Sequence, residues 1–138
     1  VVYWSGTGNT EAMANEVAEG AKAAGAEVDV LTASEFGADK MDAYDAVAFG
    51  CPAMGAEELE DSEFEPMFSD CEGKLGGKKI ALFGSYGWGD GEWMRNWVEQ
   101  MEGAGATVVG GEDAICQEAP DEDAQDELKA MGKQLAAI

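Results

Sequence analysis

The chain opens with the stretch Val1-Val2-Tyr3-Trp4-Ser5-Gly6-Thr7-Gly8-Asn9-Thr10, in which an apolar run passes into small, hydroxylic and amide-bearing residues. The apolar part is typical of a buried strand, and a helical pattern of apolar residues follows the polar part. In such a strand–turn–helix unit, the backbone N–H groups of the turn, its hydroxyls and the positive end of the helix dipole converge on one point. We therefore interpret residues 5–10 as a phosphate cradle built from uncharged donors, with an ordinary strand-to-helix loop as the alternative.

The amino-acid sequence of this turn excludes two common types of phosphate-binding loop. A nucleoside-triphosphate loop ends in Lys-Ser or Lys-Thr, but no lysine precedes Lys22. A dinucleotide loop needs a third glycine three residues after the second, and Glu11 stands at that position. What remains is a phosphate monoester held without a countercharge, which suits a mononucleotide such as FMN.

Composition limits the class of protein and its partners. The 138 residues are enough for one domain with a full core, and we expect a single domain spanning residues 1–138. The net charge of −21 comes from 29 acidic residues against eight basic ones. Such a field disfavours nucleic acid and anionic membranes as partners and attracts basic protein surfaces, although solubility or salt tolerance would also explain it.

The residue types that usually bind metals are scarce. The chain has no histidine, and its three cysteines, Cys51, Cys71 and Cys116, lack the Cys-x-x-Cys spacing of a metal site. They are typical of thiols in a reducing cytosol, so we expect a cytoplasmic protein without a metal. No apolar stretch approaches the ~20 residues that cross a bilayer, and the first residues of the sequence do not show the charged-then-apolar pattern of a secretory signal, so we expect neither a membrane span nor secretion.

Short apolar runs alternate with helical patterns along the whole chain. The predicted strands are Val1–Trp4, Val28–Leu31, Ala46–Gly50, Ile80–Gly84 and a last region within Thr107–Cys116. The predicted helical stripes are Met13, Val17, Ala21 and Ala24; Trp93, Trp97, Val98 and Met101; and Ala124, Leu128, Met131 and Leu135, with a further helix near Phe64–Cys71. This alternation predicts an α/β fold, an open parallel sheet with right-handed crossovers and helices on both faces.

Three loops are expected at one edge of that sheet, because ligands of such folds bind beyond the carboxyl ends of the strands. The loops are Ser5–Thr10, Cys51–Ser62 and Ser85–Trp93. Met54 and Trp88 are large, soft side chains amid small residues, and they could close on the two faces of a planar aromatic ring. Packing of both side chains on the sheet edge is the alternative.

These loops carry a resemblance to a known family. Tyr3–Thr10, Cys51–Glu58 and Gly84–Trp93, with Phe64-Glu65-Pro66 between them, resemble the flavodoxin family, and in particular its short-chain members from anaerobic bacteria. The resemblance implies a flavodoxin-like, five-stranded parallel sheet in the order 2-1-3-4-5, the order known for flavodoxin. The long-chain form carries an insertion in the fifth strand, whereas here the last strand region leads almost directly into the final helix.

The resemblance also implies an FMN site. The residues expected to contact the cofactor are Ser5, Gly6, Thr7, Gly8, Asn9, Thr10, Pro52, Ala53, Met54, Gly55, Ala56, Glu57, Ser85, Tyr86, Gly87, Trp88 and Gly89. Residues 5–10 would hold the phosphate, and Met54 and Trp88 would flank the isoalloxazine ring. Gly55 would place its carbonyl beside flavin N5, and Glu57 would accept a hydrogen bond from N3–H.

The remaining roles concern the edges of the cofactor. By the same resemblance, the Gly87 backbone would contact the pyrimidine edge of the flavin, and Ser85 and Pro52 would line the ribityl chain. Two positions depart from the family pattern, because relatives can have a hydroxyl residue where this chain has Pro52 and an amide where it has Glu118.

The function implied by the resemblance is electron transfer. The protein would be a low-potential one-electron carrier that binds FMN non-covalently, shuttles between semiquinone and hydroquinone, and has no substrate of its own. Its partners would be basic surfaces of redox proteins, such as ferredoxin-type oxidoreductases, and it would be a monomer. The alternatives are a small FMN-dependent quinone or azo reductase on the same fold, a non-redox receiver module and an acidic nucleic-acid mimic. A receiver module needs acidic residues at the end of the first strand to bind magnesium, and the sequence Tyr3-Trp4-Ser5 has none there.

Acidic residues cluster in the two expected ring-binding loops. They are Glu57, Glu58, Glu60, Asp61, Glu63, Glu65, Asp90 and Glu92. One carboxylate about 10 Å from an anionic flavin costs ~1.7 kcal/mol at an effective dielectric of 20, and less than half of that near water. Because about 1.4 kcal/mol corresponds to 59 mV for one electron, many acids must act together to lower the potential substantially.

The order Gly55–Ala56 leads to a testable prediction. A type II′ turn over residues 54–57 places positive φ at Gly55, whereas the opposite type II turn would force it on Ala56 at a cost of about 1–2 kcal/mol. Ala56 thereby favours the turn that offers the Gly55 carbonyl to reduced N5–H. Replacing Ala56 with Gly should lower the first reduction potential, and an unchanged or raised value in a redox titration would contradict this; Gly55→Ala should be worse.

Overall fold

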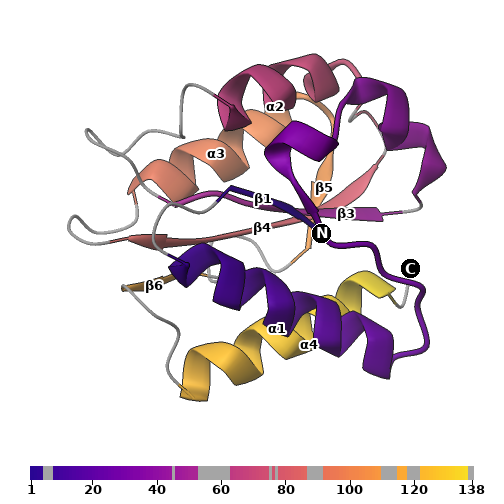
Figure 1. The fold of residues 1–138 in the computed structure, drawn as a ribbon. Coiled ribbons are helices and arrows are strands. Elements are labelled where there is room, and N and C mark those ends of the chain that lie inside the picture. The colour runs from indigo at the N-terminus through magenta and orange to yellow at the C-terminus, as the bar shows by residue number, and fades with distance from the viewer. Residues whose placement is uncertain are drawn as a thin grey trace.

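The computed structural model describes residues 1–4, 8–44, 46–52, 63–74, 76, 78–86, 92–109, 115–117 and 122–136 (Figure 1). The strands are β1 (Val2–Tyr3), β2 (Leu31–Thr32), β3 (Ala46–Gly50), β4 (Lys79–Tyr86), β5 (Thr107–Val108) and β6 (Ile115–Gln117). The α-helices are α1 (Asn9–Ala23), α2 (Phe64–Glu72), α3 (Glu92–Gly103) and α4 (Glu122–Ala136), and two 3₁₀ helices are η1 (Ala33–Glu35) and η2 (Ala38–Ala43).

The strands form one parallel sheet in the order β2-β1-β3-β4-β5, which confirms the predicted topology. Tyr3 of β1 pairs with Gly50 of β3, and Gly50 pairs with Phe83 of β4. The carboxyl ends of the three strands therefore reach the same edge. The long, continuous apolar run of β4 fits this central place, because a strand covered on both faces exposes neither side to water.

The last strand position is shared by two short strands. Ile80 of β4 pairs with Val108 of β5, and Gly84 of β4 pairs with Ile115 of β6. The two paired positions are four residues apart in β4 but seven residues apart in the segment that carries β5 and β6. The predicted strand region 107–116 is correct in place, but among the described residues it consists of two pieces instead of one continuous strand.

Helices cover both faces of the sheet, as Figure 1 shows, with α2 and α3 on one face and α1 and α4 on the other. The face toward α2 and α3 is filled largely with aromatic rings. Phe64 and Phe68 of α2 stack on each other, and both meet the Trp97 ring of α3 edge to face, with ring centroids 5.5 Å apart in each case. Such edge-to-face pairs add about 0.5–1.5 kcal/mol each beyond the area they bury.

The other face depends on a close approach of α1 and α4. A Cβ atom at Gly20 of α1 would overlap the Lys129 carbonyl oxygen of α4, and one at Gly132 of α4 would overlap the Val17 carbonyl oxygen of α1. The two glycines therefore allow backbone-to-backbone contact between the helices. Lys129 also forms an ion pair with Glu16, with 3.3 Å between Nζ and Oε2.

Some local expectations need correction. The second strand was predicted at Val28–Leu31, but the paired residues are Leu31 and Thr32. Ala24 does not extend the buried stripe of α1, because the helix ends at Ala23 and Ala24 is exposed. Neither 3₁₀ helix between β2 and β3 was predicted, since segments this short carry no measurable period. The helix near Phe64–Cys71 is present as α2.

Among the described helices, none combines the length and the apolar character that crossing a bilayer requires.

The glycine contact between α1 and α4 yields a prediction for stability. Gly132→Ala should lower the free energy of unfolding by about 1–3 kcal/mol, because the added methyl forces the helices apart even though alanine is the better helix former. Gly73→Ala is the matched control, since Gly73 has an ordinary φ of −66° and open space where the methyl would lie. Urea unfolding should show Gly73→Ala to be neutral or slightly stabilising; a Gly132→Ala protein as stable as the parent would contradict the proposed contact.

Candidate functional site

The segments predicted to bind the cofactor leave the sheet at one edge. β1 ends at Tyr3, β3 at Gly50 and β4 at Tyr86, and all three strands run in the same direction. The Trp4 N–H donates a hydrogen bond to the Gly50 carbonyl, with 3.0 Å between N and O, so β1 and β3 remain joined up to the last described residue of this segment. The strand ends from which the three predicted loops start therefore lie at one edge of the sheet, whereas most of each loop lies outside the described residues.

The start of α1 has the geometry of an anion site. Gly8 is the N-cap residue, with a left-handed backbone at φ 93°, and its carbonyl accepts the first helical hydrogen bond, from the Ala12 N–H at 3.0 Å. A residue with a Cβ would be strained in this conformation by about 1–2 kcal/mol. Since glycine has no side chain with which to cap the helix, the first-turn N–H groups have no cap from this residue and can donate to a ligand.

Thr10, in the first turn of α1, has a buried side-chain hydroxyl. It is 1% exposed, and its Oγ1 has no hydrogen-bond partner among the described residues. A buried hydroxyl without a partner costs about 1–3 kcal/mol. A ligand oxygen at the start of α1 would remove this cost, so Thr10 fits a phosphate site.

The remaining described candidates lie at the ends of β3 and β4. Ser85 is the second-last residue of β4 and is 4% exposed. Its backbone pairs with Cys116 of β6. Pro52 is half-buried and follows β3 directly, and Tyr86 is the last residue of β4. These positions agree with a ligand lying along this edge of the sheet. Ser5, Gly6, Thr7, Ala53, Met54, Gly55, Ala56, Glu57, Gly87, Trp88, Gly89 and Glu118 lie outside the described residues.

One residue at this edge was predicted as part of a core stripe and as the end of the loop Ser85–Trp93, without a role in the site. Trp93, in the first turn of α3, donates a hydrogen bond from its indole N–H to the Cys51 carbonyl oxygen, with 3.3 Å between Nε1 and O. The contact joins two segments 42 residues apart in the chain. The stripe Trp93-Trp97 predicted burial correctly, but burial alone does not say where an indole N–H points.

Two cysteine side chains are buried in the described part of the chain. Cys51 and Cys71 have no exposed surface. Burial, with the nearby Asp70 carboxylate, raises the pKa of Cys71 to about 11. Because the thiolate is the reactive form, Cys71 stays protonated and inert at neutral pH.

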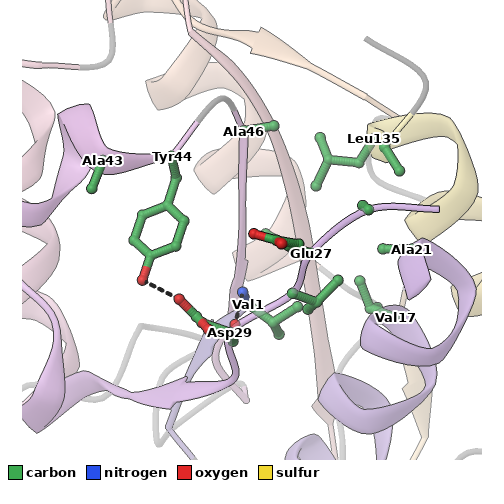
Figure 2. A pocket seen from close by; sticks show the side chains of 13 residues that line it. Val1, Val17, Ala21, Glu27, Asp29, Ala43, Tyr44, Ala46 and Leu135 are labelled. Carbon is green, nitrogen blue, oxygen red and sulfur yellow. Dashed lines mark hydrogen bonds between the residues drawn. The ribbon is translucent and has the colours of Figure 1, made fainter. Parts of the chain in front are cut away.

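The main cavity among the described residues lies at the opposite end of the sheet (Figure 2). Its volume is about 550 Å³, and it is lined at the beginnings of strands by Val1, Asp29 and Ala46. Tyr44 donates a hydrogen bond to Asp29 across its wall, at 2.8 Å. Other lining residues come from α1 and from the end of α4, such as Val17, Ala21 and Leu135. The cavity is separate from the edge where the predicted loops leave the sheet.

Comparison with known proteins identifies the family and agrees with the fold. The sequence pattern of the family described as Flavodoxin matches residues 1–131. The chain belongs to the flavodoxin family. It is 53% identical over 136 residues to a flavodoxin from Megasphaera elsdenii, covering 99% of this chain and 96% of that protein. It is 49% identical over 138 residues to a flavodoxin from Clostridium beijerinckii, covering 100% and 99%.

Solved structures agree with this assignment. The solution structure of two-electron reduced Megasphaera elsdenii flavodoxin superimposes with a TM-score of 0.91 at 52% identity, covering 99% of this chain and 97% of that one. A rubredoxin:oxygen oxidoreductase from Desulfovibrio gigas, at 22% identity, shares the fold alone. The protein is therefore an FMN-binding electron-transfer protein of the short-chain type, and it carries electrons to redox partners without being an enzyme. The alternative of a quinone or azo reductase is not supported by these relatives.

Proposed function

We propose that this protein is a low-potential, cytoplasmic one-electron carrier, a single domain over residues 1–138 that holds FMN at the carboxyl edge of its sheet. The observation that carries the site is the buried Thr10 hydroxyl, which lacks a hydrogen-bond partner within the described part of the chain and lies near the left-handed Gly8 at the start of α1. FMN when bound supplies the redox chemistry, because its ring system accepts and returns single electrons. The chain supplies binding, orientation and charge.

The phosphate end is argued from described residues. Donors at the start of α1, namely the first-turn N–H groups and the Thr10 hydroxyl, stabilise a phosphate by hydrogen bonds and by the helix dipole. No lysine or arginine occurs among residues 1–21, so these donors carry no formal charge. We assign Ser5, Gly6, Thr7, Gly8, Asn9 and Thr10 to this end. Of these residues, the structure describes Gly8, Asn9 and Thr10.

The ring end is assigned from the loops that leave β3 and β4. Pro52, Ala53, Met54, Gly55, Ala56 and Glu57 would contact it from one side, and Ser85, Tyr86, Gly87, Trp88 and Gly89 from the other. The register that aligns Gly50 with Phe83 supports this, because it brings the bases of both loops to neighbouring strands. No metal has a part in the proposed function.

The phosphate assignment makes a prediction with opposite signs for binding and stability. Thr10→Val should weaken FMN binding by about 1.5–3 kcal/mol, or roughly 10- to 150-fold, because a hydrogen bond to a charged group is lost. The same change should stabilise the FMN-free protein by about 1 kcal/mol, because it removes an unpaired buried hydroxyl. FMN titration and urea unfolding of the FMN-free protein measure the two effects.

Two control variants sharpen this test. Thr10→Ser keeps the hydroxyl and should retain most of the affinity. Thr107→Val changes an exposed threonine of β5, which pairs with the first residue of β4 at the far edge of the sheet, and should leave FMN binding unchanged. If Thr10→Val bound FMN as tightly as the parent, the phosphate assignment would be wrong.

We further propose that basic surfaces of redox proteins, such as ferredoxin-type oxidoreductases, dock on the acidic protein and that it acts as a monomer. The net charge of −21 supports electrostatic attraction to a basic partner. The buried positions of Cys51 and Cys71 fit thiols of a protein in a reducing cytoplasm.

The docking proposal predicts a strong dependence on salt. Electron transfer from the reduced protein to a basic acceptor such as cytochrome c should slow by about tenfold as ionic strength rises from roughly 0.01 to 0.5 M, because salt screens the attraction. Stopped-flow measurements provide the rates, and an uncharged quinone acceptor is the control. A cytochrome rate that does not change with salt would refute steering by charge.

A further inference from the structure

Trp93 connects the bases of the two loops assigned to the flavin ring. It is the second residue of α3, the helix that begins directly after residues 87–91, and it is 2% exposed. Its indole N–H donates to the carbonyl oxygen of Cys51, the residue that follows β3 and leads into residues 53–62. A single buried hydrogen bond therefore spans the points at which both loops join the fold.

The carbonyl that receives this bond is held from several directions. The Cys51 N–H donates to the Phe83 carbonyl at 3.1 Å, which continues the ladder between β3 and β4 by one residue. A Cβ atom at Gly84 would overlap the Cys51 carbonyl oxygen and lie 3.2 Å from Cζ2 of Trp93. Gly84 thus leaves the space into which the carbonyl and the indole fit together.

The orientation of this peptide matters because proline follows it. Pro52 fixes its own φ near −65° and has no N–H, and it confines the preceding residue to extended conformations. The plane of the Cys51–Pro52 peptide therefore sets the direction in which the chain enters the loop. The Trp93 N–H holds the oxygen of that same peptide.

We propose that Trp93 is a positioning residue for the FMN ring system, which it orients indirectly by fixing the Cys51–Pro52 peptide relative to α3. This inference rests on the proposed function, in which residues 52–57 and 85–89 contact the ring. Trp93 keeps the two loop bases at a constant separation, so the points from which both loops reach the ring are set before the ring binds.

The chain provides a matched control one helical turn away. Trp97 is also 2% exposed and also belongs to α3, but its Nε1 has no hydrogen-bond partner among the described residues. Trp93→Phe and Trp97→Phe remove the same ring area from the same buried layer. They differ in that the first also removes the donor to Cys51.

The experiment compares these two variants with the parent. Trp93→Phe should weaken both FMN and riboflavin by about five- to tenfold, the range expected for one net hydrogen bond, and Trp97→Phe should stay within about twofold of the parent. Riboflavin lacks the phosphate, so it reports on the ring alone. In the proposed site the Gly55 carbonyl accepts a hydrogen bond from flavin N5 only when the ring is reduced, so we expect Trp93→Phe to shift the first reduction potential. The shift would be 59 mV for each tenfold difference between its effects on the affinities of the two redox states, at about 1.4 kcal/mol per tenfold.

The outcomes separate this proposal from the phosphate assignment. Equal effects of Trp93→Phe and Trp97→Phe on riboflavin affinity and on the potential would overturn the positioning role, whereas Thr10→Val tests the phosphate assignment independently. If Trp93→Phe failed to fold in urea-unfolding controls, NMR of the parent would provide the same test. Exchange of the Trp93 indole proton with solvent should slow when riboflavin binds, while that of Trp97 should not; the same response at both would also overturn the proposal.

Discussion

The parallel register of β1, β3 and β4 is the constraint on which the rest of the molecule depends. Tyr3, Gly50 and Phe83 lie side by side across the three strands, so the chain leaves the sheet at one edge each time. A slip of one residue would turn the buried side chains of a strand to the opposite face and misplace the loop that follows. Packing on two faces fixes the register, and the register places the site.

The site combines an uncharged anchor with an acidic protein. In the proposed site the donors at the start of α1 are peptide N–H groups and a hydroxyl, so they would bind a phosphate without neutralising the net charge of −21. Electrostatic repulsion from the protein would then remain available to disfavour extra electrons on a bound flavin. In this proposal the affinity comes from directed hydrogen bonds, whereas the reduction potential and the attraction of a basic partner depend on the summed charge of the protein.

Much of this arrangement could be predicted from the sequence, because strong periodicity and glycine-rich turns are local signals. The apolar runs at 46–50 and 80–84 correspond to central strands, and the stripe Leu128, Met131 and Leu135 faces the core. The position of β2 could not be predicted as well, since only two of its residues pair and an edge strand needs no long apolar run. The role of Trp93 depends on a contact with Cys51 far along the chain, which no local pattern records.

The division of the last strand position has a consequence for how this fold can vary. β5 is bound to the beginning of β4 and β6 to its end, each through its own pairs. Each piece is secured by its own pairs, so neither pairing fixes the length of chain that separates the two pieces. Additional chain could therefore be accommodated there without disturbing the sheet or the edge proposed to carry the cofactor, and this is where the long-chain form of the family differs from the short one.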